Sequence, residues 1–156
     1  MCSSDLRDIS PLLASPSAMT AATDAFVARI AGNRIDMIAG IESRGFLFST
    51  LLAGRMGVGS LMIRKPGKLP GKLVRAKYAL EYGDAEITLQ RDAPVNGSSV
   101  LVVDDLLATG GTIVAAKSLL EGCGATVPAC AVVVELASLG GRAAVGTRVV
   151  ALKSYD

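Results

Sequence analysis

Two adjacent carboxylates and a glycine–threonine turn stand close together in the stretch VLVVDDLLATGGT, residues 100–112. Four apolar residues, 100–103, lead into Asp104 and Asp105, so we expect these acids at the carboxyl end of a buried strand. Adjacent carboxylates repel each other and resist burial unless a ligand donates hydrogen bonds to them or brings positive charge. The hydroxyls of a diol supply such hydrogen bonds, and a developing carbocation or a metal ion supplies such charge.

The turn after the acids has the composition of a phosphate site, and it consists of Ala108, Thr109, Gly110, Gly111 and Thr112. Glycine lets backbone N–H groups approach a ligand closely, and the threonine hydroxyls add donors. A helix predicted over 112–124 contributes unpaired N–H groups and its dipole, which favour an anion. An acid pair beside a phosphate cradle matches the two ends of a ribose 5-phosphate, whereas either half alone could be an ordinary turn with solvated acids.

The composition restricts the chemistry further. The 156 residues include no His, which excludes Ser-His-Asp and Cys-His catalysis and any His-ligated metal. Cys2, Cys123 and Cys130 have no C-x-x-C spacing, so we expect neither a disulfide framework nor a zinc site, and we expect a cytoplasmic protein. The net charge of +2 gives little general attraction to nucleic acid.

The apolar segments do not predict a membrane protein. Hydrophobic residues make up 51% of the chain, but no run reaches the roughly 18 apolar residues of a spanning helix. The N-terminal residues lack the basic and apolar regions of a secretory signal. The length is enough for one domain with a substantial core.

Short apolar strands alternate with helices, which predicts an α/β domain with a mainly parallel central sheet flanked by helices. Ligands of such sheets bind outside the carboxyl ends of the strands, where the acids and the glycine turn are expected. An antiparallel hairpin is predicted over 78–90. The other expected elements are a helix from Pro16 toward Gly32, a helix over 46–57, and strands over 35–40, 60–64, 128–136 and 147–154.

Residues 65–77 are rich in Pro, Gly and Lys and show no periodicity, so we predict an exposed, mobile loop. Contact with nucleic acid or a membrane is a first interpretation, but the segment has neither interleaved aromatic residues nor an amphipathic helix. A solvated loop is a second interpretation. The third is a lid that closes on hinges at Gly67 and Gly71, places Lys65 and Lys68 on phosphates, and excludes water from the reaction.

The motif VVDDLLATGGT resembles the phosphoribosyl pyrophosphate signature of the type I phosphoribosyltransferases. Five further segments resemble the adenine-specific members of that family, in order and with suitable spacing: RDISPLL (7–13), IAGIESRGFLF (38–48), IRKPGKLPG (63–71), YALEYGDAEI (78–87) and VELASLGGR (134–142). The resemblance implies the type I phosphoribosyltransferase fold, in one domain over residues 1–156. The residues before Arg7 do not match the apolar, proline-containing segment usual in the family, so a shortened N-terminal segment is expected.

The resemblance implies transfer of a 5-phosphoribosyl group from phosphoribosyl pyrophosphate to adenine, giving AMP and pyrophosphate through an oxocarbenium-like transition state. Asp104 and Asp105 would hold the ribose hydroxyls, and residues 108–112 would hold the 5-phosphate. Mg²⁺ would be held mainly by substrate oxygens, without a dedicated protein metal site. The family also implies a homodimer.

The resemblance assigns catalytic roles to further residues. Arg44, Lys65 and Lys68 would neutralise the pyrophosphate. Glu81 would donate to adenine N7, by full proton transfer or by a hydrogen bond alone, and Tyr82 would support the closed lid. An ordinary Glu titrates near pH 4.3, so a protonated Glu81 requires burial. The alternatives are an Arg44 that caps a surface turn and a Glu81 that faces water.

The adenine pocket would be lined by Arg7 and by Leu106, which would pack on the base, whereas Glu42 is expected to be structural. Two other functions stay open. One is phosphoribosyl transfer to another base, and the other is a non-catalytic regulator that binds phosphoribosyl pyrophosphate. Such a regulator could lose its lid lysines and its acid, so the presence of Lys65, Lys68 and Glu81 favours catalysis.

Overall fold

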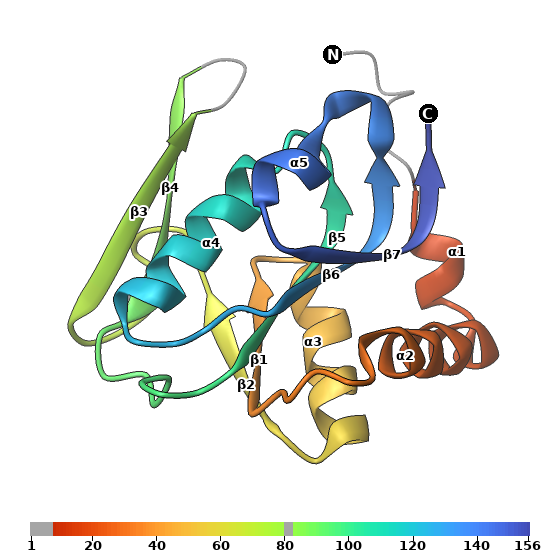
Figure 1. The fold of residues 1–156 in the computed structure, drawn as a ribbon, viewed down its shortest axis with the longest axis horizontal. Helices are drawn as coiled ribbons and strands as arrows, with labels where there is room; N and C mark the ends of the chain where they lie inside the picture. The colour runs from red at the N-terminus through yellow and green to blue at the C-terminus, as the bar shows by residue number, and fades with distance from the viewer. Residues whose placement is uncertain (1–7, 80–82) are drawn as a thin grey trace.

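A computed structural model describes residues 8–79 and 83–156, and its largest element is a five-stranded sheet (Figure 1). The strand order is β2-β1-β5-β6-β7, and every neighbouring pair is parallel. This confirms the predicted parallel sheet. The strands are β1 (Met37–Ile41), β2 (Gly59–Ile63), β5 (Val100–Leu107), β6 (Ala129–Leu136) and β7 (Arg148–Tyr155).

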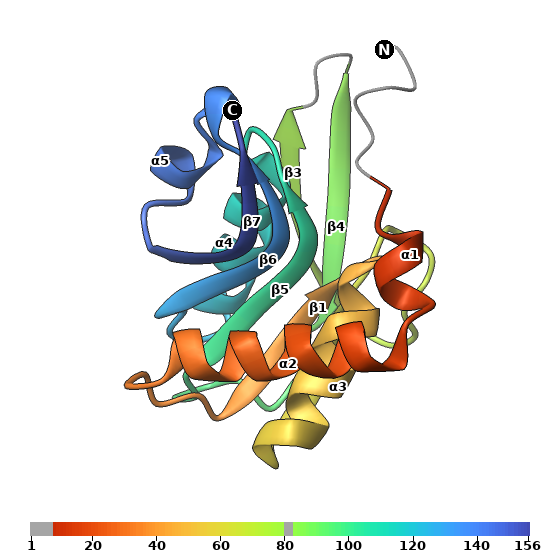
Figure 2. The same cartoon turned by 90° about the vertical axis from the view of Figure 1, so that its right-hand side faces the viewer.

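Helices cover both faces of the sheet (Figures 1 and 2). On one face α2 (Pro16–Ile30) and α3 (Gly45–Met56) pack on a core that includes Leu101 of β5. On the other face α4 (Gly111–Gly122) packs on a core that includes Val102. Because successive strand residues point to opposite faces and both faces are buried, residues 100–103 of β5 are apolar without alternation.

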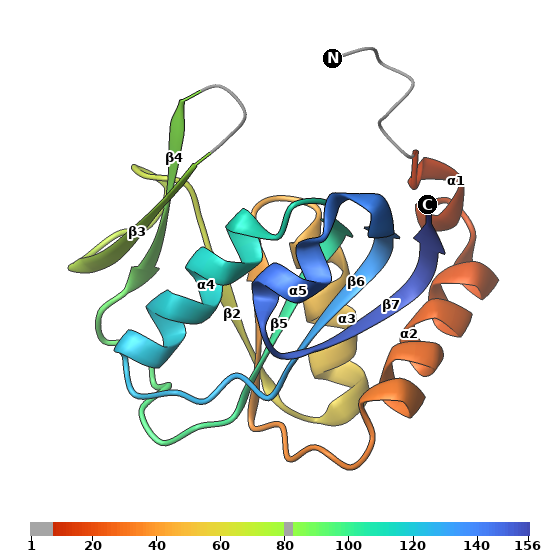
Figure 3. The same cartoon turned by 45° about the horizontal axis from the view of Figure 1, so that its top comes forward.

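The hairpin forms a separate antiparallel sheet of β3 (Leu73–Ala79) and β4 (Asp84–Gln90), which packs beside α4 (Figure 3). The prediction of irregular chain over 65–77 is therefore wrong from Leu73 onward. Residues 74, 76 and 78 pack against the core, while Arg75 and Lys77 between them are exposed. This alternation is typical of a half-buried strand, but the surrounding basic residues obscured it.

The remaining predicted elements are present, with ends that differ by one or two residues. Three short elements were not predicted because they are too short to show periodicity: α1 (Ser10–Leu13), the 3-10 turn η2 (Ala137–Leu139) and α5 (Gly141–Val145). Within 8–79 and 83–156, no helix combines the length and the apolar character needed to span a membrane.

The strand β5 is longer than predicted, and it projects beyond its neighbour β1. The pairing of β1 with β5 ends at Gly40 and Val103, whereas β6 stays paired with β5 as far as Leu107 and Glu135. Asp104 and Asp105 therefore lie inside the strand rather than after it. On the side of β1 this projecting part of β5 meets the turn that follows β1. The chain leaves β1 and β5 toward opposite faces of the sheet, so this is a topological switch point, where ligands of α/β sheets bind.

Candidate active site

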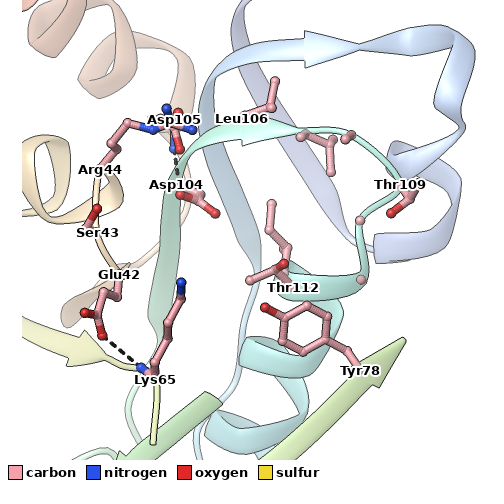
Figure 4. A pocket seen from close by; sticks show the side chains of 15 residues that line it. Glu42, Ser43, Arg44, Lys65, Tyr78, Asp104, Asp105, Leu106, Thr109 and Thr112 are labelled. Carbon is pink, nitrogen blue, oxygen red and sulfur yellow. Dashed lines mark hydrogen bonds and ion pairs between the residues drawn. The ribbon is translucent and has the colours of Figure 1, made fainter. Parts of the chain in front are cut away.

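A pocket of about 450 Å³ opens at this switch point (Figure 4). Its walls come from the turn after β1, from single residues before β3 and within it, and from a continuous stretch that runs from β5 into the first turn of α4. The stretch from Asp104 to Thr112 holds both predicted halves of a sugar-phosphate site. The lining residues are Glu42, Ser43, Arg44, Lys65, Tyr78, Asp104, Asp105, Leu106, Leu107, Ala108, Thr109, Gly110, Gly111, Thr112 and Ile113.

The two acids have different surroundings because successive side chains of a strand point in opposite directions. Asp105 is buried, and its Oδ2 lies 2.7 Å from Nε of Arg44. Asp104 is directed away from Arg44, and its Oδ1 accepts a hydrogen bond of 2.9 Å from the backbone N–H of Asp105 (Figure 4). One carboxylate therefore has a cationic partner, while the other faces the pocket.

Loss of hydration at the floor of the pocket raises the pKa of Asp104 well above its usual range. The negative charge of Asp105 raises it further, and the Asp105 N–H and the Arg44 guanidinium act against these two effects. Hydroxyl donors or positive charge brought by a ligand would lower this pKa again, because they stabilise the ionised form. Asp104 is therefore suited to bind a polyol or a cationic group.

The glycine–threonine turn ends on the N-terminus of α4, with Gly110 as the N-cap residue at φ +89°. Within the described part of the chain no side chain caps this helix, so its first N–H groups have no intrahelical partner. Thr109 and Thr112 lie at the same side of the pocket (Figure 4). Backbone donors, hydroxyls and the helix dipole converge there, which is the arrangement that binds phosphate.

Glu42 holds the start of the basic connection between β2 and β3. Its Oε2 accepts a 2.8 Å hydrogen bond from the backbone N–H of Lys65, and the Arg64 guanidinium lies 3.3 Å from both of its oxygens. Burial alone would raise the pKa of Glu42, but these hydrogen bonds and the positive charges of Arg64 and Lys68 outweigh it, and the pKa is lowered. The geometry agrees with the expected structural role of Glu42.

The structure brings most of the predicted site residues together. Arg44, Lys65, Leu106, the acid pair and residues 108–112 all line the pocket, and the Lys65 side chain points into it (Figure 4). Lys68 does not line the pocket; it is exposed, and its carbonyl accepts a hydrogen bond of 3.1 Å from Arg64. Three further predicted residues, Arg7, Glu81 and Tyr82, lie outside the described residues.

The sequence prediction missed Ser43, Tyr78, Leu107 and Ile113 as pocket residues. A signal existed for Tyr78, because it continues the alternation of inward residues along β3. Ser43 stands between two residues that were considered, Glu42 and Arg44, so its proximity could have been noted. Ile113 follows Thr112 directly, but its side chain belongs to the core.

The same fold and motifs occur in known proteins. The sequence-family model of the phosphoribosyl transferase domain matches residues 9–148. The chain belongs to the phosphoribosyltransferase family.

Among curated relatives, the adenine phosphoribosyltransferase of Gluconobacter oxydans is 50% identical over 149 residues, which cover 96% of this chain and 83% of the relative. That of Cricetulus griseus is 51% identical over 144 residues, which cover 90% and 80%. Within the family, the chain thus belongs to the adenine phosphoribosyltransferases.

Solved structures agree with this placement. The adenine phosphoribosyltransferase of Thermoanaerobacter pseudethanolicus has a TM-score of 0.93 and 40% identity, over 96% of this chain and 88% of that one. The Saccharomyces cerevisiae enzyme, solved with adenine and an imino-altritol bisphosphate, has a TM-score of 0.90 and 39% identity, over 95% and 86%. The Trypanosoma brucei enzyme, solved with AMP, pyrophosphate and ribose-5-phosphate, has a TM-score of 0.85 and 29% identity, over 94% and 68%.

Proposed function

We propose that this chain transfers the 5-phosphoribosyl group of phosphoribosyl pyrophosphate to adenine and releases AMP and pyrophosphate, a reaction of purine salvage. The observation that carries the proposal is the single stretch from Asp104 to Thr112, which places a carboxyl and a phosphate cradle in one pocket. Adenine as the base is supported by the relatives of 50% and 51% identity and by the adenine-bound yeast structure.

The sugar is held at two points. Asp104 and Asp105 accept hydrogen bonds from the ribose hydroxyls, and their negative charge stabilises the oxocarbenium character that develops at C1. The turn 108–112 and the N-terminus of α4 hold the 5-phosphate. Each charge-assisted hydrogen bond contributes about 1.5–3 kcal/mol, so several of them together matter for the rate.

Positive groups around the pocket stabilise the departing pyrophosphate. Arg44 holds Asp105 through Nε, and its guanidinium has two further nitrogens that can bind an oxyanion. Lys65 extends into the pocket, and Lys68 reaches the pyrophosphate when the connection between β2 and β3 closes as a lid, with Gly67 and Gly71 as its hinges. Leu106 packs on the base, Arg7 lines the adenine side, and Tyr82 supports the closed state.

We expect the reaction to require Mg²⁺, which would be held mainly by substrate oxygens. Within the described ranges no group of three or more Cys, Asp or Glu side chains could hold a metal ion. Asp104 is the pocket carboxyl best placed to contact it. When bound, such a cation would neutralise charge on the pyrophosphate. We expect a chelator to abolish turnover and added Mg²⁺ to restore it; full activity in the chelator would contradict this.

The activity is tested by measuring pyrophosphate release with phosphoribosyl pyrophosphate, Mg²⁺ and each of adenine, hypoxanthine, guanine, xanthine and orotate. We expect turnover with adenine well above that with the other bases. Preference for another base would replace the proposal with the transferase alternative. A thermal shift with phosphoribosyl pyrophosphate but no turnover with any base would indicate the non-catalytic regulator.

Glu81 is the acid that we place at adenine N7. We expect Glu81→Ala to lower kcat by about 10²–10⁴-fold, the usual contribution of a general acid or base. The matched control is Glu86→Ala on β4, which removes only an ion pair with the exposed Arg75 and should leave kcat close to that of the wild type. Steady-state kinetics of the two variants decide the point, and full activity of Glu81→Ala would reject this assignment.

We also propose a cytoplasmic homodimer. Leu47 and Leu51 of α3 and Met62 of the adjacent β2 are 46%, 46% and 50% exposed, which provides apolar area for a second copy. Cys123 and Cys130 are unpaired, as a reducing compartment favours. Light scattering of the purified protein tests the dimer, with a monomer mass as the contrary result, and cell fractionation tests the location.

A further inference from the structure

The phosphate turn has a second wall behind it, built by the chain between β6 and β7. A Cβ added to Gly110 would lie 2.9 Å from the carbonyl oxygen of Gly141, and a Cβ added to Gly141 would collide with the carbonyl oxygen of Ala108. Gly110 and Gly141 can approach each other this closely only because neither has a side chain. The position of Gly141, at the start of α5, therefore sets how the phosphate turn can lie.

One guanidinium fixes that segment to the sheet. Arg142 follows Gly141, and it donates from Nε to Oε1 of Glu135 at 2.9 Å and from Nη2 to Oε2 at 2.5 Å. Its Nη1 donates to the carbonyl oxygen of Val149 on β7 at 2.6 Å. The hydrogen bonds to Glu135 raise the pKa of Arg142, so it stays charged. A single side chain thus ties α5 to two neighbouring strands.

Glu135 is a buried carboxylate, 4% exposed, at the end of β6. In the sheet it is the register partner of Leu107, the residue that immediately precedes the phosphate turn. The turn is therefore flanked on both sides by parts of one rigid unit: the paired strand end at Leu107 and the Gly141 backbone behind it. Neither charged residue of the pair lines the pocket, so any effect on substrate passes through this backbone.

We propose that Glu135 and Arg142 are positioning residues for the 5-phosphate group of the substrate: their ion pair presses the Gly141 backbone against the phosphate turn and fixes the directions of its N–H groups. The inference rests on the proposed function, because the turn is taken to bind a sugar phosphate. The inference distinguishes binding of the sugar-phosphate end of the substrate from binding of adenine and pyrophosphate. Loss of the pair should weaken the sugar-phosphate end of the substrate and leave adenine and pyrophosphate binding unchanged.

The test removes both charges together, because removing Arg142 alone would leave Glu135 buried without its cation and could unfold the protein. The variant is Glu135→Met with Arg142→Met. A second variant, Arg142→Lys, keeps the charge but cannot form the two parallel hydrogen bonds. The matched control is Arg34→Met, which removes an exposed arginine whose Nε lies 2.9 Å from Asp36, before the start of β1 and at the opposite end of the sheet.

Ribose 5-phosphate binding is measured by calorimetry, beside the KM values for both substrates and the melting temperature. We expect the double variant to weaken ribose 5-phosphate and to raise the KM for phosphoribosyl pyrophosphate by about 10–100-fold, since small misplacements of a binding group cost this much. The KM for adenine and the affinity for pyrophosphate should stay within about twofold of the Arg34→Met control, and Arg142→Lys should fall between the two.

A folded double variant that binds ribose 5-phosphate like the control would overturn the inference, even if its melting temperature has dropped. If the double variant does not fold, the same comparison on Arg142→Lys decides in the same way. Failure of the proposed function looks different: wild-type protein would bind ribose 5-phosphate without turning over adenine, and the affinity comparison among the variants would still decide the role of the ion pair.

Discussion

Replacing Asp104 with Asn is expected to lower kcat/KM by about 10²–10³-fold, the range seen when one electrostatic group of an active site is removed, while making the protein more resistant to heat. The activity falls because Asn removes the negative charge that faces the ribose. The stability rises because burial and the neighbouring Asp105 disfavour the ionised Asp104 in the folded state, which is why its pKa is raised. A neutral amide avoids that cost. A gain of about 1 kcal/mol corresponds to roughly 2–4 °C in a chain of this size.

The raised pKa of Asp104 determines how the stability difference between the wild type and Asp104→Asn changes with pH. The folded state binds the proton of Asp104 more tightly than the unfolded state, whose pKa is about 3.9. This proton contributes stability that is fully present below that pH and is lost as the pH rises through the folded pKa. The melting temperature of Asp104→Asn should therefore match the wild type in acid and exceed it near neutrality. The control is Asp24→Asn, which changes an exposed ion pair with Arg55. An active variant, or one less stable at neutral pH, would contradict the proposed role.

Gly110→Ala is expected to raise the KM for phosphoribosyl pyrophosphate by about 10²-fold, through a displacement of the phosphate turn. Gly110 has φ +89°, and an added Cβ would meet the rigid backbone of Gly141 at 2.9 Å. The strain can be relieved only if the turn or its wall moves. Either movement redirects the N–H groups that face the phosphate.

Gly32→Ala separates this effect from backbone strain in general. Gly32 has φ +90°, and a Cβ there would meet nothing within 4 Å. It lies between α2 and β1, at the opposite end of β1 from the pocket residue Glu42. We expect both variants to lose stability of about 1–2 kcal/mol from the left-handed backbone, but only Gly110→Ala to lose substrate affinity. Denaturant melts and steady-state kinetics on the pair check this, and equal KM values would show that the turn tolerates the methyl group.

The fold could be predicted where local periodicity reports the contacts of a segment. The strands of the central sheet are buried on both faces and appear as short apolar runs, so their existence and type were predicted correctly. The strand β3 was missed because Arg75 and Lys77 face water between inward residues of modest size. The true end of β5 was missed because two acids in a row are typical of a strand end. It is the continued pairing with β6 as far as Leu107 that keeps them inside the strand.

The candidate site could be predicted where its residues are contiguous in sequence. The acids and the phosphate turn follow each other along the chain, so composition alone indicated their chemistry. The contribution of Tyr78 depends on how the hairpin packs beside α4, and the partnership of Arg142 with Glu135 depends on the position of α5. These are three-dimensional relations that spacing does not specify. Arg44 was predicted for pyrophosphate, and its contact with Asp105 was not foreseen.

The projection of β5 past β1 has a consequence for the spacing of the proposed contacts with the sugar. Because one unbroken strand-to-helix stretch would carry both sugar contacts, the distance between the hydroxyl site and the phosphate site would follow from the backbone of that stretch. Arg44 and Lys65, the cations proposed for the leaving group, come from separate segments, and their movement would not change that distance. The proposed contacts with the pentose would therefore keep one spacing, while the contacts with the leaving group could change position.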